Sequence, residues 1–291
     1  MMSLQGICFN LSASVNDYRR DKAIPLPEGV TQCRNISYGS HGKWSMLDVY
    51  HPNGAANPLP TIVSIHGGGY VYGTKEIYRR YGMDMAARGF AFVNFNYRLA
   101  PKWKFPVPLW DTNNVMEWVC KNADRYHLDP SRILLIGDSA GAQLASQYAA
   151  IATNPDYAAL FNMTVPEITI RAVGLNCGLY DIPAMSQGKR TGLALDYLGT
   201  GISSDDPRLN VLDAITGSYP SAFITTSCHD YLRENAEPMY AHLNSRGISA
   251  AWKCYGTEED ESIGHVFHVN IALPEAKRCN DDAAEFFRKH I

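Results

Sequence analysis

Residues 132–144 read RILLIGDSAGAQL, and this stretch decides the fold. The apolar run RILLI is followed directly by the pattern G-x-S-x-G, formed by Gly137, Ser139 and Gly141, and then by a helical pattern. A strand, this pattern and a helix in that order predict a nucleophile elbow, in which small neighbours let strand and helix approach closely. The turn strains the backbone of the serine and holds its hydroxyl at the positive end of the helix. A glycine-rich turn with an ordinary N-cap serine is the competing interpretation, which the flanking strand and helix disfavour.

Short apolar runs recur on both sides of this junction. Most of them are continuous rather than alternating, as expected for strands that are buried on both faces. The predicted strands cover residues 44–50, 61–65, 90–96, 132–136, 169–176, 222–228 and 249–255. The predicted helices cover residues 76–88, 108–123, 139–152, 234–246 and 274–290. Strand and helix alternate, which predicts an α/β fold with a mostly parallel sheet and helices on both faces.

Two regions, residues 1–40 and residues 178–220, break this alternation. The first contains no predicted strand, and the second is rich in Gly, Ser, Asp and Pro around one helical stretch, TGLALDYLG. Surface loops and a ragged terminus are the simplest interpretation. A small lid is the alternative, because long insertions between core elements are more often functional than idle. We predict one domain over residues 1–291, with these two regions as its lid pieces.

The composition limits the classes of partner. The chain has 291 residues, 46% hydrophobic and 19% charged, and a formal net charge of −3. This balance argues against a nucleic acid or an anionic membrane as partner, since both need clustered Lys and Arg. No apolar run reaches the ~18 residues that span a bilayer. The first residues, MMSLQGICFNLSAS, lack a basic region and a sustained apolar stretch, so no signal peptide is predicted.

The cysteines agree with a cytoplasmic location. Their number is odd, their spacing is wide, and no C-x-x-C pair occurs, so neither a disulfide framework nor a zinc site is predicted. A reducing cytoplasm is therefore the expected compartment. The seven cysteines are Cys8, Cys33, Cys120, Cys177, Cys228, Cys254 and Cys279.

A second glycine-rich motif, IHGGGYVYG at residues 65–73, follows an earlier predicted strand. Acyl transfer through a serine places negative charge on the former carbonyl oxygen, which needs N–H donors aimed at it. Three glycines without side chains allow the backbone to approach a substrate closely. We predict Gly67 and Gly68 as donors, with the N–H of Ala140 as the third, while Gly69 allows the turn. We expect His66 to brace this loop by hydrogen bonding rather than to act as a base.

Four motifs in order resemble the hormone-sensitive-lipase-like branch of the α/β-hydrolase esterases. They are HGGGY at 66–70, YRLAP at 97–101, GDSAG at 137–141 and HDYLREN at 229–235. The resemblance runs from about residue 44 to the C-terminus. It implies an α/β-hydrolase fold with an eight-stranded, mostly parallel sheet and a lid built from the N-terminus and an insertion after strand six. It also implies hydrolysis of short-chain carboxylic esters without a metal or cofactor.

The acid and the base follow the nucleophile in the order Ser, Asp, His in this fold. Asp230 follows the strand pattern AFITTSC, and the family pattern D-x-L-R-(D/E) aligns on it. Two histidines, His265 and His268, follow the last predicted strand in SIGHVFHVN. We predict His265 as the base, because the family pattern H-x-F matches it and Gly264 gives the chain freedom to turn there.

The leading hypothesis is a serine carboxylesterase that acts on small, acetyl-like esters through an acyl-enzyme. An amidase, arylformamidase or peptidase on the same scaffold is the first alternative, and the sequence does not separate it from an esterase. A non-catalytic small-molecule receptor is the second, which the intact Ser139, Asp230 and His265 disfavour. The resemblance also allows a homodimer. Four tyrosines are the candidates for substrate contacts: Tyr70, Tyr72, Tyr180 and Tyr197.

Overall fold

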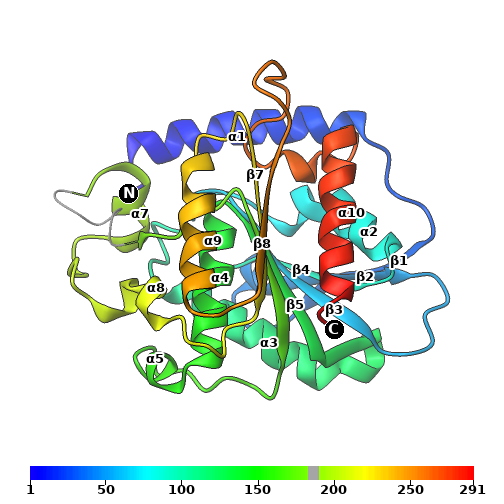
Figure 1. The fold of residues 1–291 in the computed structure, drawn as a ribbon, viewed down its shortest axis with the longest axis horizontal. Coiled ribbons are helices and arrows are strands. Elements are labelled where there is room, and N and C mark those ends of the chain that lie inside the picture. The colour runs from blue at the N-terminus through cyan, green and yellow to red at the C-terminus, as the bar shows by residue number, and fades with distance from the viewer. Residues whose placement is uncertain (183–189) are drawn as a thin grey trace.

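The computed structural model describes residues 1–182 and 190–291. Eight strands form one sheet in the order β1-β2-β4-β3-β5-β6-β7-β8 (Figure 1). β2 pairs antiparallel with β1 and with β4, and all other neighbours are parallel. The predicted α/β-hydrolase fold with an eight-stranded, mostly parallel sheet is confirmed. The strands are β1 Val30–Ser37, β2 Met46–Pro52, β3 Leu59–Ile65, β4 Ala91–Phe95, β5 Leu128–Asp138, β6 Ile170–Asn176, β7 Ser221–Ser227 and β8 Ala250–Tyr255.

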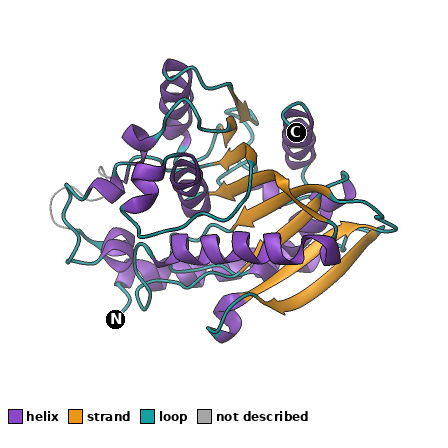
Figure 2. Cartoon of the chain, turned by 90° about the horizontal axis from the view of Figure 1, so that it is seen from below, coloured by secondary structure: helices purple, strands orange, loops and turns teal. Residues whose placement is uncertain are grey.

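Helices cover both faces of the sheet (Figure 2). On one face, α3, α4 and α9 share an apolar core with the strands, and Leu109, Leu144 and Leu243 are fully buried in it. On the other face, α2 and α10 close a second core, which contains Met85 and Phe287. The helices are α1 Leu4–Ala23, α2 Arg79–Ala87, α3 Val107–Tyr126, α4 Ala140–Thr153, α5 Pro155–Ala159, α7 Gly192–Leu198, α8 Val211–Ala214, α9 Ala236–Ser245 and α10 Pro274–Arg288.

The register of the parallel strands brings their carboxyl ends to one edge of the sheet. Ile65 at the end of β3 lies beside Gly137 of β5, and Ser227 at the end of β7 lies beside Tyr255 of β8. The loops that follow these four strands therefore emerge side by side. In open α/β sheets, ligands bind outside the carboxyl ends of the strands, so the fold itself indicates where a site lies.

The first forty residues differ from the expectation of no strand. They form helix α1 and the edge strand β1, which pairs with β2 through an irregular register between Cys33 and Ile36. β1 is only half-buried and carries polar side chains, so it has no apolar run of the kind that marks the central strands. Helix α1 crosses the carboxyl end of the sheet (Figure 1).

The insertion at 178–220 contains the short helices α7 and α8, while residues 183–189 lie outside the described part of the chain. Its helix α7 contacts α1 through Asp196, whose carboxylate accepts hydrogen bonds from the backbone N–H of Ser3 at 2.9 Å and from its hydroxyl at 2.6 Å. The two predicted lid pieces are thus joined to each other. Within the described residues, every helix is too short or too polar to cross a membrane.

Candidate active site

Ser139 sits at the sharp turn between β5 and α4. Its φ is 53° and its ψ is −121°, a conformation that few non-glycine residues adopt. Its N–H donates to the carbonyl of Asn176 at 2.9 Å, which fixes the turn to β6. A Cβ on Gly141 would overlap the main chain of β3, so helix α4 can approach the sheet only with glycine there. This geometry holds the serine at the N-terminus of α4, where the helix dipole favours negative charge.

Asp230 and His265 contact each other beyond the ends of β7 and β8. His265 Nδ1 lies 2.6 Å from Asp230 Oδ1. The same carboxylate accepts hydrogen bonds from the Thr226 hydroxyl at 2.8 Å and the Leu232 N–H at 2.9 Å. Burial acts to raise the pKa of Asp230, but the hydrogen bond and charge of His265 with these two donors hold it below its usual value. An ionised Asp230 keeps the proton on Nδ1, which leaves Nε2 as the proton acceptor.

The second histidine, His268, lies in the core. It is 1% exposed, and neither ring nitrogen has a hydrogen-bond partner among the described residues. Its ring meets the edge of Tyr81 at a centroid distance of 5.2 Å. Burial lowers the pKa of His268 to about 3, so it is neutral at physiological pH. Of the two histidines, it is His265 that contacts the carboxylate.

A cavity of about 460 Å³ brings the candidate residues together. Ser139, His265 and Gly68 all line it. Helix α1 forms its opposite wall, and the loop that carries residues 261–273 forms its rim. The residues contributed by α1 are Phe9, Ser12, Ala13, Asn16, Asp17 and Arg20.

A family model described as BD-FAE matches residues 47–242, which is more than half of the chain. The chain belongs to the BD-FAE family. The matched residues run from β2 to α9 and include Ser139 and Asp230, but they stop before His265.

The similarities of this chain to known proteins agree with the fold. It is 29% identical to carboxylesterase NlhH of Mycobacterium tuberculosis over 69% of this chain and 66% of that protein. It is 27% identical to versiconal hemiacetal acetate esterase of Dothistroma septosporum over 79% of this chain and 73% of that protein. Esterase B from Lactobacillus rhamnosis has a TM-score of 0.88 at 23% identity, over 96% of this chain and 93% of that one. The resemblance to hormone-sensitive-lipase-like carboxylesterases is confirmed, and the BD-FAE chain is a serine hydrolase of that type.

The prediction that the Gly67 N–H serves as an oxyanion donor is wrong. Its N–H donates to the Tyr78 hydroxyl at 3.0 Å, and that hydroxyl donates to the buried Asp138 carboxylate at 2.7 Å. Within residues 1–182 and 190–291, the N–H groups of Gly68 and Gly69 form no hydrogen bond. The N–H of Ala140 is likewise free, because the first N–H groups of a helix have no partner within it. The candidate oxyanion donors are therefore the N–H groups of Gly68, Gly69 and Ala140.

The buried His66 holds the glycine loop, residues 67–69, in place through its side-chain contacts. It is fully buried, its Nδ1 lies 2.8 Å from the Gly67 carbonyl, and its ring stacks on Tyr97 at a centroid distance of 4.2 Å. The Tyr97 hydroxyl donates to the His66 carbonyl at 3.0 Å. Burial lowers the pKa of His66 to about 4, so the ring stays neutral. These contacts match the bracing expected from the sequence.

The prediction of substrate contact is wrong for three of the four tyrosines. Tyr72 lines the cavity, but Tyr70 and Tyr197 stack face to face in the core with ring centroids 3.7 Å apart. The Tyr70 hydroxyl donates to Gln143 Oε1 at 3.1 Å, so its polar end is satisfied inside the protein. Tyr180 is 4% exposed and packs in the same core. Position beside the glycine loop or in the insertion does not distinguish a core tyrosine from one at the cavity.

Several residues that the structure places at the cavity were not predicted from the sequence. The α1 residues were missed because no helix was predicted in residues 1–40. Tyr231 was missed although it directly follows Asp230 in the motif HDYLREN. Its ring centroid lies 4.2 Å from that of His265. Adjacency to a motif residue was the available signal for Tyr231.

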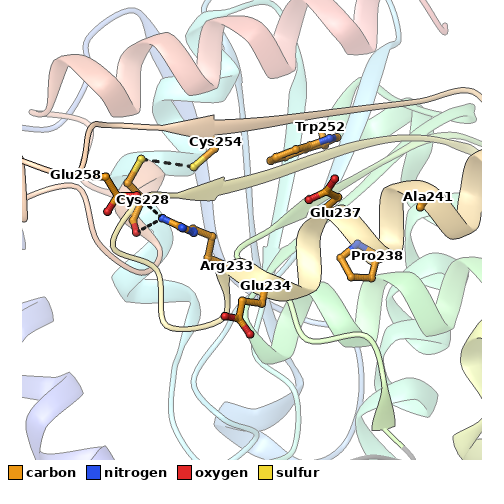
Figure 3. A pocket seen from close by; sticks show the side chains of 9 residues that line it. All are labelled: Cys228, Arg233, Glu234, Glu237, Pro238, Ala241, Trp252, Cys254 and Glu258. Atoms are coloured by element: carbon orange, nitrogen blue, oxygen red, sulfur yellow. Dashed lines mark hydrogen bonds and ion pairs between the residues drawn. The ribbon is translucent and has the colours of Figure 1, made fainter.

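A larger hollow of about 630 Å³ lies over the β7–β8 edge and helix α9 (Figure 3). Arg233 donates there to the Cys228 carbonyl at 2.9 Å and to Glu258 at 2.8 Å. The sulfur atoms of Cys228 and Cys254 lie 3.7 Å apart. Neither Ser139 nor a glycine-loop N–H lines this hollow, so the smaller cavity is the candidate active site of the BD-FAE chain.

Among the described residues, one cluster offers three candidate metal ligands, namely Cys177, Asp230 and His265, with ligand atoms within 4.8 Å of one another. Burial raises the pKa of the Cys177 thiol well above its ordinary value. Metals bind the thiolate rather than the thiol. His265 Nδ1 and Asp230 are already bonded to each other, so the donor set suits an acid–base pair better than a metal site.

Proposed function

We propose that the chain hydrolyses small carboxylic esters with short acyl groups, acetyl among them, through an acyl-enzyme on Ser139. The observation that carries the proposal is the single cavity on which Ser139 and His265 both open, with His265 Nδ1 held 2.6 Å from Asp230. A nucleophile, a base and an orienting carboxylate in one cavity are what acyl transfer through a serine requires.

In the first step, His265 Nε2 accepts the Ser139 proton while the serine oxygen bonds to the ester carbonyl carbon. The carbonyl oxygen becomes negative and accepts hydrogen bonds from the N–H groups of Gly68, Gly69 and Ala140. The imidazolium gives its proton to the departing alcohol oxygen as the C–O bond breaks. Water then attacks the acyl-enzyme by the same route and releases the carboxylic acid.

The size of the cavity supports short acyl groups. Its volume of about 460 Å³ lies near the lower end of the range for small-molecule sites. Helix α1 spans it and is attached to the core below, since Asn10 donates to the Val71 carbonyl at 3.2 Å and Tyr72 donates to Asp17 at 2.9 Å. We infer that α1, with the insertion around α7, forms the lid of a single domain. The Dothistroma relative is named for an acetate ester, which agrees with this substrate size.

Replacement of Ser139 by alanine tests the proposal. We expect Ser139→Ala to lose hydrolysis of p-nitrophenyl acetate by a factor on the order of a million, because the nucleophile acts as a unit with its base. Ser14→Ala, an exposed serine on the outer side of α1, is the matched control and is expected to retain wild-type activity. A Ser139→Ala protein that keeps a tenth of wild-type activity after repeated purification would contradict the assignment.

Two further measurements separate the alternatives. A p-nitrophenyl phosphonate ester is expected to transfer its phosphonyl group to the Ser139 oxygen with release of p-nitrophenol. The peptide that contains Ser139 then gains the mass of the ester less that of p-nitrophenol in the wild type, and gains nothing in the Ser139→Ala protein. Hydrolysis of p-nitrophenyl acetate is compared with that of p-nitroacetanilide, which differs only in the bond to be cleaved. Faster cleavage of the anilide would assign the site to amides rather than to esters.

A further inference from the structure

Tyr231 lies against His265 in the cavity but has no role in the mechanism proposed above. It follows Asp230 in the loop after β7 and lines the cavity together with Ser139 and His265. Its ring lies against the His265 imidazole, with centroids 4.2 Å apart and an angle of 37° between the planes. The residue is nonetheless 69% exposed. Tyr231 therefore lies at the mouth of the cavity, above the base.

The phenol of Tyr231 shares the cavity with the nucleophile, Ser139. Partial desolvation by its neighbours raises the pKa of Tyr231 to about 12, although the nearby Ser139 side chain acts to lower it. The phenol therefore keeps its proton throughout the neutral range and is available as a hydrogen-bond donor.

The position of Tyr231 assigns it to the alcohol half of an ester. In the proposed mechanism, the carbonyl oxygen accepts hydrogen bonds from the N–H groups of Gly68, Gly69 and Ala140. The departing alcohol oxygen must lie near His265 Nε2, because that nitrogen returns the proton to it. Tyr231 covers the same imidazole and lines the cavity beside Ser139, so we place its hydroxyl on the side where the alcohol departs.

We propose that Tyr231 is a catalytic residue for the alcohol half, whose hydroxyl donates a hydrogen bond to the departing oxygen of the ester. This inference rests on the proposed function. In the acylation step, the bond from Ser139 Oγ to the carbonyl carbon forms and the bond from that carbon to the alcohol oxygen breaks. The serine proton passes through His265 to the alcohol, and Tyr231 keeps its own proton. Its contribution is to stabilise the negative charge that builds on the departing oxygen before the proton arrives.

The inference predicts a dependence on the leaving group. An alkoxide develops strong negative charge as it departs and needs a donor, whereas p-nitrophenolate spreads its charge over the ring and leaves without help. Ethyl butyrate and p-nitrophenyl butyrate share the same acyl group, so they form the same acyl-enzyme and differ only in the acylation step. The value of kcat/KM reports that step for both substrates.

Tyr231→Phe is the test, because it removes the hydroxyl and keeps the ring over His265. We expect kcat/KM for ethyl butyrate to fall about ten- to a hundredfold, the range for a hydrogen bond to a charged group. We expect kcat/KM for p-nitrophenyl butyrate to stay within about twofold of wild type. Tyr18→Phe, a change at an exposed tyrosine of α1 outside the cavity lining, is the matched control and is expected to leave both values unchanged.

Two outcomes would overturn the inference. An equal fall for both esters would show that Tyr231 acts only by packing, and no fall for either would show that its hydroxyl has no part in the reaction. A wild-type protein that hydrolyses neither ester would instead refute the proposed function, so the two failures are distinguishable. Thermal melting of the Tyr231→Phe protein checks that the variant is folded.

Discussion

Replacing Asp138 with asparagine probes the most unusual carboxyl group of the site. Asp138 precedes Ser139, is 2% exposed and accepts a hydrogen bond from the Tyr78 hydroxyl at 2.7 Å. Burial raises the pKa of Asp138 from 3.8 to about 7, although that hydrogen bond lowers it. Because the pKa of Asp138 is higher in the folded state, its contribution to stability is fully present below pH 3.8, where the carboxyl is neutral in both states. This contribution is lost as the pH rises through about 7, where the buried carboxyl must ionise.

The size of this effect follows from the two pKa values. A change from 3.8 to about 7 corresponds to about 4 kcal/mol in the free energy of unfolding. Asparagine has nearly the same shape and no charge to bury. We therefore expect the Asp138→Asn protein to gain about 4 kcal/mol relative to wild type between pH 4 and pH 8.

Urea unfolding, followed by tryptophan fluorescence at pH 4, 6 and 8, measures this difference. Each free energy is taken as wild type against variant at the same pH, so contributions from other titrating groups cancel. Asp124→Asn, at an exposed position of α3, controls for the removal of a negative charge. A difference between wild type and Asp138→Asn that stays within about 1 kcal/mol across the three pH values would refute the reasoning.

Four more predictions concern the base, its partner, the buried His268 and the substrate. Asp230→Asn should lower kcat by about four orders of magnitude in steady-state kinetics, because the His265 tautomer is no longer fixed, as known for the aspartate of other serine triads; a loss below tenfold would argue against this role. His265→Ala should be nearly inactive, while His268→Phe should keep most of its activity, and the reverse ranking would move the base to His268. Burial lowers the pKa of His268 in the folded state from 6.5 to about 3, so the stability present above pH 6.5 is lost as the pH falls and the unfolded chain takes up the proton. Phenylalanine takes up no proton, so the His268→Phe protein should unfold less readily than wild type near pH 4. In a series of p-nitrophenyl esters, activity should fall steeply beyond butyryl, and faster hydrolysis of long-chain emulsions would contradict a cavity of about 460 Å³.

The central strands could be predicted from sequence because burial on both faces leaves continuous apolar runs. β5 illustrates the limit of that signal. Its apolar part, 132–136, was predicted, but the strand begins at Leu128, and the residues from Asp129 to Ser131 form no apolar run. The edge strand β1 was missed for the same reason, since its pairing with β2 requires no apolar pattern.

The site shows a similar division. Ser139, Asp230 and His265 could be selected from sequence because each lies in a short motif after a predicted strand. The hydrogen bond of the Gly67 N–H could not be predicted from the sequence. Its acceptor is the hydroxyl of Tyr78, whose position depends on the turn between the two residues and on Asp138. Contacts between segments far apart in the chain are set by tertiary packing, which leaves no local pattern.

The cavity is assembled from two parts of the chain that are held in place in different ways. The reacting groups belong to loops at the ends of core strands, where a shift of the backbone would disturb the sheet. Its opposite wall is helix α1, which is fastened to the rest of the protein by side-chain bonds such as Ser3 to Asp196 and Arg20 to the Ile77 carbonyl. Mutations on the inner face of α1 can therefore change which esters fit while the hydrolytic machinery stays intact. Libraries confined to Phe9, Ser12, Ala13 and Asn16 would search substrate preference in this enzyme at little cost to its fold.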